Sequence, residues 1–184
     1  MNHGSHTLAT LAVLACAMSA PSAAQPVPRA GPVIRDFGPV YDIVAPTFST
    51  PTNRAYRLVF EVALAPADST APNERLITVA RFLNMHARAG VPRDSLEAAV
   101  VIHGPAARAA LRDDTYMTRF GVGNPDLRIL QALHEAGVRV ILCGQSSMSR
   151  GFYPDLLAPQ VELALSAMTA LTVLQQDGYV LNPF

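Results

Sequence analysis

The stretch VRVILCGQSSMSRGF, Val138 to Phe152, joins an apolar run to a small polar sequence. A near-continuous apolar run of this length is typical of a strand that is buried on both faces of a sheet. Gly144 then allows a tight turn, and the polar residues after it predict a short helix over about 145–150. The stretch therefore predicts a strand, a turn and a helix, with Cys143 at the carboxyl end of the strand.

The rest of the chain from about Arg54 onward repeats this alternation. Strands are predicted at 55–65, 96–104, 138–144, 159–165 and 179–184, and helices at 74–90, 105–114, 125–137, 145–150 and 166–178. The stretch 113–124 is predicted to be a polar linker or a broken helical turn. Strands that alternate with helices form right-handed βαβ units. We therefore predict an α/β fold of the flavodoxin-like type, a three-layer sandwich with a mostly parallel five-stranded sheet.

Two segments precede this domain. Residues 1–24 hold an apolar core, Leu8 to Met18, which is too short to span a bilayer and is followed by small residues. We predict a secretory signal peptide that is cleaved before Gln25, and hence an exported, periplasmic protein without membrane contact after cleavage. Residues 25–52 contain six prolines and predict an extended arm whose scattered apolar residues favour contact with the fold. Residues 53–184 are predicted to form the α/β domain.

Composition excludes several classes of function. The chain has 184 residues, with 14 basic and 14 acidic residues and a formal net charge of zero, so we expect no nucleic-acid partner and no polybasic membrane patch. All 14 basic residues are arginine, which excludes Schiff-base chemistry on a lysine and a lysine-containing phosphate loop. His86, His103 and His134 do not form a metal-ligand spacing, so we expect no metal site and no cofactor.

The cysteines direct attention to one thiol. Removal of the signal takes away Cys16 and leaves Cys143 as the single cysteine, which excludes an internal disulfide. A lipoprotein whose first residue is Cys16 is the alternative. Backbone N–H groups of Gln145 and Ser146, at the start of the predicted helix, would stabilise a thiolate at Cys143 and lower its pKa. Arg150 would add positive charge if its side chain folds back.

A second candidate residue lies at the end of another strand. The sequence VIHGPA places His103 at the end of the strand 96–104, and Gly104 turns the backbone there. Parallel strands bind ligands beyond their carboxyl ends, so His103 and Cys143 face one crevice if their strands are neighbours. A solitary activated cysteine suits persulfide carriage, acyl or thiol transfer, or redox sensing. The alternative is that Cys143 is a small core residue and His103 a structural histidine.

Three motifs resemble a known family. VIHGPA, CGQS…RG and SAMTALTVLQQDGYVLNPF are similar to segments of the DsrE/DsrF-like sulfur-relay proteins, and the resemblance covers residues 98–184. It implies a flavodoxin-like domain that forms homotrimers or hexamers and a cysteine, Cys143 here, that carries sulfur as a persulfide. It also implies a sulfur donor and acceptor, which are proteins or small sulfur species. The resemblance gives no role to His103, Gln145 or Arg150.

From the residues and the resemblance we expect a periplasmic sulfur carrier or sulfurtransferase-like protein. Cys143 is then the persulfide-forming nucleophile, and His103 orients the acceptor or moves a proton. The residues expected around the ligand are Gly104, Gly144, Gln145, Ser146 and Arg150. The sequence does not decide whether the protein turns over a substrate. The alternatives are a non-catalytic oligomeric module that binds a small ligand, and a thiol redox sensor.

Overall fold

Five parallel strands form the centre of the computed structural model, which describes Met1 and residues 25–183. The strands are β1 (Tyr56–Val62), β2 (Leu96–Ile102), β3 (Arg139–Cys143), β4 (Val161–Ala164) and β5 (Val180–Asn182). Their order in the sheet is β4-β3-β2-β1-β5, and every neighbouring pair is parallel. This confirms the predicted flavodoxin-like α/β fold. Apart from Met1, the predicted signal peptide lies outside the described residues.

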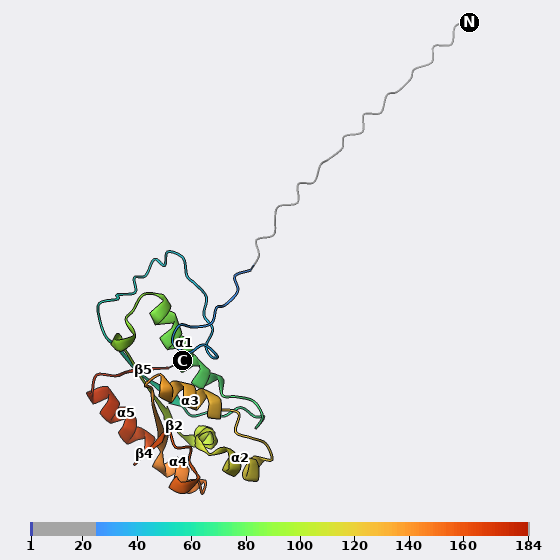
Figure 1. The fold of residues 1–184 in the computed structure, drawn as a ribbon, viewed down its shortest axis with the longest axis vertical. Helices are drawn as coiled ribbons and strands as arrows, with labels where there is room; N and C mark the ends of the chain where they lie inside the picture. The colour runs from blue at the N-terminus through green and yellow to red at the C-terminus, as the bar shows by residue number, and fades with distance from the viewer. Residues whose placement is uncertain (2–24, 184) are drawn as a thin grey trace.

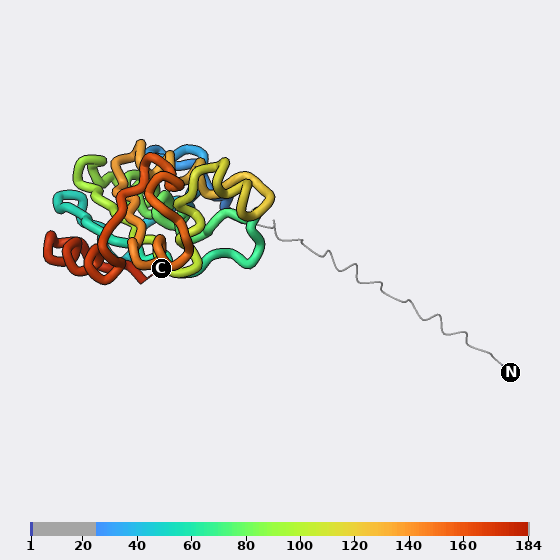
Figure 2. The backbone as a smooth tube through the Cα atoms, turned by 90° about the horizontal axis from the view of Figure 1, so that it is seen from below, coloured from blue at the N-terminus to red at the C-terminus, as the bar shows by residue number. Residues whose placement is uncertain are grey.

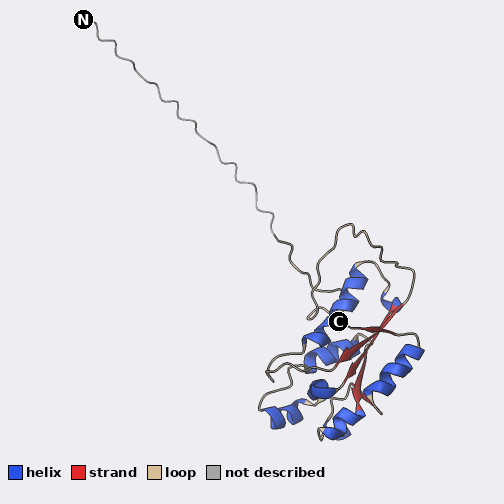
Figure 3. Ribbon diagram, turned by 180° about the vertical axis from the view of Figure 1, so that it is seen from behind, coloured by secondary structure: helices blue, strands red, loops and turns tan. Residues whose placement is uncertain are grey.

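Helices cover both faces of the sheet (Figures 1 and 3). They are α1 (Glu74–Arg88), α2 (Asp113–Phe120), α3 (Leu127–Glu135), α4 (Gly144–Ser149) and α5 (Ala167–Gln176), with the 3-10 helices η1 (Arg93–Ser95), η2 (Gly104–Ala110) and η3 (Pro154–Leu156). Helices α1 and α3 pack on one face and α5 packs on the other. None of the helices in the described part of the chain is both long and apolar enough to span a membrane.

The region between β2 and β3 differs from the prediction. The predicted helix 105–114 is instead a 3-10 turn, η2, followed by the separate helix α2. Leu111 forms an antiparallel bridge with Leu157, and this pairing interrupts the helical hydrogen bonds between η2 and α2. Gly121 ends α2 because its left-handed backbone, with φ of 77°, turns the chain out of the helix, while its N–H still bonds the carbonyl of Met117. The stretch 113–124 therefore contains a regular helix, which the sequence left open.

Side chains alternate between two hydrophobic layers. Phe60 and Val62 of β1 point into the larger layer under α1 and α3, and Val59 points into the smaller layer under α5. The helix α5 alone covers the smaller layer, and two apolar residues beside the start of this helix, Leu165 and Met168, are 73% and 78% exposed. The α5 face is therefore the less completely covered side of the sheet.

The arm, residues 25–52, is tied to α1 through its first part, which lies on the side of the molecule away from α5 (blue in Figure 2). Asn84 of α1 is completely buried and contacts the arm through its amide. Its Oδ1 accepts from the N–H of Val33 (3.2 Å) and Ile34 (2.9 Å), and its Nδ2 donates to the carbonyls of Ile34, Phe37 and Gly38 (2.9 Å each). An ion pair between Arg88 and Asp42 (2.7 Å) adds a contact at the surface. The buried amide of Asn84 thus attaches the arm to α1.

Candidate functional site at the carboxyl edge of the sheet

The structure brings His103 and Cys143 to the same edge and the same face of the sheet. Strands β2 and β3 are neighbours, and Ile102 is paired with Leu142, so the next residue on each strand is His103 and Cys143. The backbone of His103 is extended, which continues the alternation of side chains past the strand. Both side chains therefore lie on the face of the sheet that α5 covers, and Cys143 belongs to the smaller hydrophobic layer.

The Cys143 thiol is nearly buried and surrounded by donors. Its exposure is 5%. Burial raises the pKa of the thiol, but hydrogen bonds to the sulfur from the Ser146 hydroxyl and from the backbone N–H groups of Ser146, Ala167 and Gln145 outweigh that effect. The pKa therefore lies below its ordinary value, because donors favour the charged form.

These donors come from the first turns of two helices. Gln145 and Ser146 lie in the first turn of α4, as the sequence predicted, and Ala167 is the first residue of α5. Ser166 caps α5 through a hydrogen bond from the N–H of Thr169 (3.0 Å), which holds the first turn in place. Sequence reasoning missed Ala167, because only the pairing of β3 with β4 brings the start of α5 to the thiol.

Two polar side chains connect α4 to its surroundings. The Ser146 Oγ accepts a hydrogen bond from the N–H of Gly104 (2.9 Å), which joins the end of β2 to the turn after β3. Gln145 is exposed, and its Nε2 donates to the carbonyl of Leu165 (3.3 Å) after β4. Gly104 has φ of 53°, a left-handed conformation that suits the predicted turn. Ser146 thus contacts both the thiol and the His103–Gly104 turn.

Gly144 serves a purpose that the sequence did not indicate. A tight turn was expected, but Gly144 is the first residue of α4 and is not among the glycines with positive φ in the described chain. A Cβ at this position would lie 2.5 Å from the carbonyl oxygen of Ala164. Glycine is needed here because the end of β4 passes directly over the start of α4.

His103 forms a pair with a residue that the sequence analysis did not single out. Its Nε2 lies 2.8 Å from Oε1 of Glu61, and the two side chains are 26% and 43% exposed. Glu61 is on β1, and its register opposite Val101 places it on the α5-facing side near the carboxyl edge. A lone carboxylate in the apolar strand RLVFEVAL was the available signal. To infer the contact with His103 from this signal, one would need to know which face of the sheet Glu61 is on and that β1 and β2 are neighbours.

Arg150 is not brought to the thiol. It follows the last residue of α4, at the opposite end of that helix from Cys143, and is exposed. Its carbonyl accepts a long hydrogen bond from Arg119 (3.4 Å). The lowered pKa of Cys143 therefore depends on hydrogen bonds and not on this guanidinium. Within the described residues, no group of three His, Cys, Asp or Glu side chains is arranged to hold a metal.

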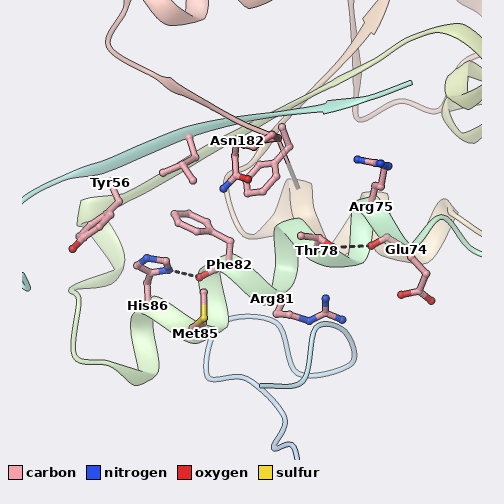
Figure 4. Close-up of a pocket in the computed structure, with 12 residues that line it drawn as sticks. Tyr56, Glu74, Arg75, Thr78, Arg81, Phe82, Met85, His86 and Asn182 are labelled. Atoms are coloured by element: carbon pink, nitrogen blue, oxygen red, sulfur yellow. Dashed lines mark hydrogen bonds between the residues drawn. The ribbon is translucent and has the colours of Figure 1, made fainter. Parts of the chain in front are cut away.

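A separate groove of about 830 Å³ lies on the other face of the sheet, between α1 and the strands β1 and β5 (Figure 4). Tyr56, Phe82 and His86 line one end, and Glu74 and Arg75 lie at the other. The ring of His86 packs on Phe82 with 4.4 Å between centroids, and its Nδ1 bonds the Phe82 carbonyl (2.9 Å). His86 is thus a packed, structural histidine, and the groove is distinct from the carboxyl edge.

We expect Ser146→Ala to move the reactivity of Cys143 to higher pH. The substitution removes a donor to the sulfur, which destabilises the thiolate and raises the thiol pKa toward its ordinary value. Alkylation by iodoacetamide at neutral pH should therefore be slower, and the rise of its rate with pH should begin later. Ser149→Ala is the matched control. Ser149 lies at the far end of α4, and its hydroxyl bonds the Ser146 carbonyl and not the sulfur. An unchanged pH profile in Ser146→Ala would exclude this hydrogen bond as a cause of the lowered pKa.

Fold and site together define a small α/β protein whose free thiol is held by hydrogen bonds at the carboxyl edge of a parallel sheet. The model of the DsrE/DsrF-like family matches residues 48–183, and the chain therefore belongs to this family. The match includes β1 and α1, which the resemblance over 98–184 did not cover. A search of curated proteins found no match.

Two solved structures share the fold. One is a protein of unknown function, MTH1491 from Methanobacterium thermoautotrophicum, with a TM-score of 0.53. The other is the ychN protein from E. coli, with a TM-score of 0.52. Each is 19% identical to this chain, and each alignment covers 70% of this chain and 99% of the other. At this identity the similarity shows the fold.

Proposed function

We propose that this member of the DsrE/DsrF-like family is an exported sulfur carrier that holds sulfane sulfur as a persulfide on Cys143. The observation that supports the proposal is the set of donors around the sulfur, from the Ser146 hydroxyl and from the first turns of α4 and α5. These donors favour the thiolate, which is the form that attacks a sulfane sulfur atom. They also favour Cys143 as a leaving group when the sulfur is passed on.

Loading of the carrier is a thiol exchange that needs no external oxidant. The Cys143 thiolate attacks the outer sulfur of a donor R–S–SH. A new S–S bond forms at Sγ, the S–S bond of the donor breaks, and its electron pair leaves with R–S⁻. The products are Cys143–S–SH and a thiolate, so charge and sulfur oxidation states balance. Thiosulfate reacts in the same way and releases sulfite.

Intact-mass spectrometry after incubation with polysulfide or thiosulfate tests the proposal. Each sulfur atom that is bound adds about 32 Da, and the adduct is removed by a reducing thiol. Trypsin cleaves the chain after Arg139 and Arg150, so the adduct is expected on the peptide 140–150, which separates Cys143 from Cys16. If no adduct forms with either donor, the carrier function is wrong.

The low exposure of Cys143 favours a second candidate, a module that binds a small ligand at the carboxyl edge without chemistry at the thiol. In that case Cys143 lines the site as a buried apolar residue. The two functions differ in thiol accessibility under native conditions. A carrier predicts alkylation of Cys143 in the folded protein, whereas a ligand-binding module predicts alkylation only after unfolding.

We also propose that the chain associates with itself through the α5 face. Leu165, which follows β4, and Met168, in the first turn of α5, are largely exposed there. Large apolar side chains that are exposed close together, as these two are at the start of α5, are typical of subunit contacts. We expect Leu165→Asp to shift the wild-type oligomer toward monomer in sedimentation-velocity experiments. Val44→Asp, a charge at an exposed apolar position of the arm, is the control. A monomeric wild-type protein would contradict this proposal.

A further inference from the structure

The Glu61–His103 pair has no part in holding the Cys143 thiolate. The hydrogen bonds that lower the pKa of Cys143 come from α4 and from the start of α5. His103 is on the next strand at the same edge, and its Nε2 is engaged by Glu61 at 2.8 Å. The edge therefore carries two polar arrangements side by side, a set of donors for the sulfur and a histidine paired with a carboxylate.

The pair fixes which ring nitrogen can act on a ligand. Because the carboxylate of Glu61 accepts at Nε2, a neutral His103 carries its proton there and presents the lone pair of Nδ1. A carboxylate on the far nitrogen also stabilises the imidazolium that forms when Nδ1 takes up a proton. Glu61 thus prepares His103 to act as a base toward a group bound at the carboxyl edge.

We infer that Glu61 is a positioning residue for His103, and that His103 is the general base that takes the proton from an incoming acceptor thiol. This inference rests on the proposed persulfide on Cys143. It favours a thiol as the acceptor over sulfite, because sulfite is already an anion at neutral pH and does not need a base. The outer sulfur of the persulfide extends about 2 Å beyond Sγ, at the edge that His103 shares.

The transfer step balances without a co-reactant. Nδ1 of His103 accepts the proton of R′–SH, and R′–S⁻ attacks the outer sulfur of Cys143–S–SH. The bond between Sγ and the outer sulfur breaks, and its electron pair stays on Sγ as the thiolate that Ser146, Gln145 and Ala167 hold. The products are R′–S–SH, the Cys143 thiolate and protonated His103 beside Glu61. The sulfur is moved without net oxidation or reduction.

The test measures loss of the persulfide mass from the loaded full chain when free cysteine is added as acceptor. At pH 7 about 3% of a thiol with a pKa of about 8.5 is ionised, so a base can raise the rate by up to roughly 30-fold. We expect Glu61→Ala to slow transfer by about 10-fold at pH 7, and Glu61→Gln, which keeps an acceptor but loses the charge, by about 3-fold. At about pH 9.5 the acceptor is already ionised, so both variants should equal the wild type.

Two further variants separate this role from a structural one. In a His103→Ala background, Glu61→Ala should cause no additional loss, because Glu61 acts only through His103. Glu97→Ala is the matched control, since Glu97 is an ion-paired carboxylate on the same face of β2 near the opposite end of the strand. It should leave transfer unchanged at every pH.

The outcomes distinguish the inference from the function on which it rests. A wild-type chain that never acquires the persulfide overturns both. A chain that is loaded normally, but in which Glu61→Ala transfers at the wild-type rate at pH 7, overturns the inference alone. A deficit that persists at about pH 9.5, above the ordinary thiol pKa of about 8.5, also overturns it, because the loss would then be structural.

Discussion

Cys143→Ser abolishes the gain of about 32 Da per sulfur atom with every donor if the proposed function is right. A hydroxyl cannot form a persulfide, yet it can accept the hydrogen bonds that Ser146, Gln145 and Ala167 direct at this position. We therefore expect a complete loss of sulfur binding with a change in the free energy of unfolding of only about 1 kcal/mol. Intact mass and urea denaturation of the same preparation measure the two quantities.

Arg150→Ala is the control for that experiment. Arg150 is at the far end of α4 and contributes no hydrogen bond to the thiol, so its removal should leave the adduct in place. An adduct that remains in Cys143→Ser would show that sulfur binds elsewhere on the chain. The mapped peptide 140–150 of the wild type would then show whether Cys143 carries sulfur in addition to that site.

Asn84→Ala is expected to release the arm and lower the free energy of unfolding by about 2–4 kcal/mol. The buried amide accepts from two N–H groups and shares its two N–H hydrogens among three carbonyls of residues 33–38, and alanine makes none of these contacts. The arm can lift away and hydrate these groups, which limits the loss. Urea denaturation measures the stability, and trypsin cleavage after Arg35 reports release of the arm.

Asn53→Ala is the matched control for the arm. Asn53 is an exposed asparagine just after the arm, so its replacement should change neither stability nor the rate of cleavage. Asn84→Asp gives a finer comparison, because it keeps the acceptor for Ile34 but loses the donor to Phe37 and Gly38. If Asn84→Ala were as stable and as resistant to trypsin as the wild type, the arm would not depend on this amide.

Local patterns predicted the fold well because the strands are nearly uniform in chemistry. The run VRVIL, residues 138–142, predicts a strand buried on both faces, and all but its first residue belong to β3. Helix α1 begins after Asn73, whose side chain accepts from the N–H of Arg75, as its capping position suggested. The break between η2 and α2 was not predictable in this way, because Leu111 pairs with Leu157, far away in the sequence.

The candidate site was predicted only in part. Cys143, Gln145 and Ser146 follow one another in sequence, and a strand-turn-helix pattern was enough to place backbone donors beside the sulfur. Ala167 and Glu61 come from distant segments. No local sequence pattern predicts that Ala167 contacts Cys143 or that Glu61 contacts His103. Arg150 was predicted to approach the Cys143 thiol if its side chain folds back. It does not do so, because α4 carries Arg150 to the end of the helix opposite Cys143.

The sequence by itself determined the alternation of strands and helices, the position of Cys143 at the end of a buried strand, and the polar turn that follows it. These properties depend on side-chain polarity and backbone preference within a few residues. The order of the strands was decided by tertiary structure, since it depends on which faces the helices cover and on which strand edges then pair. That order places β1, β2 and β3 side by side and brings Glu61, His103 and Cys143 to one face of one edge.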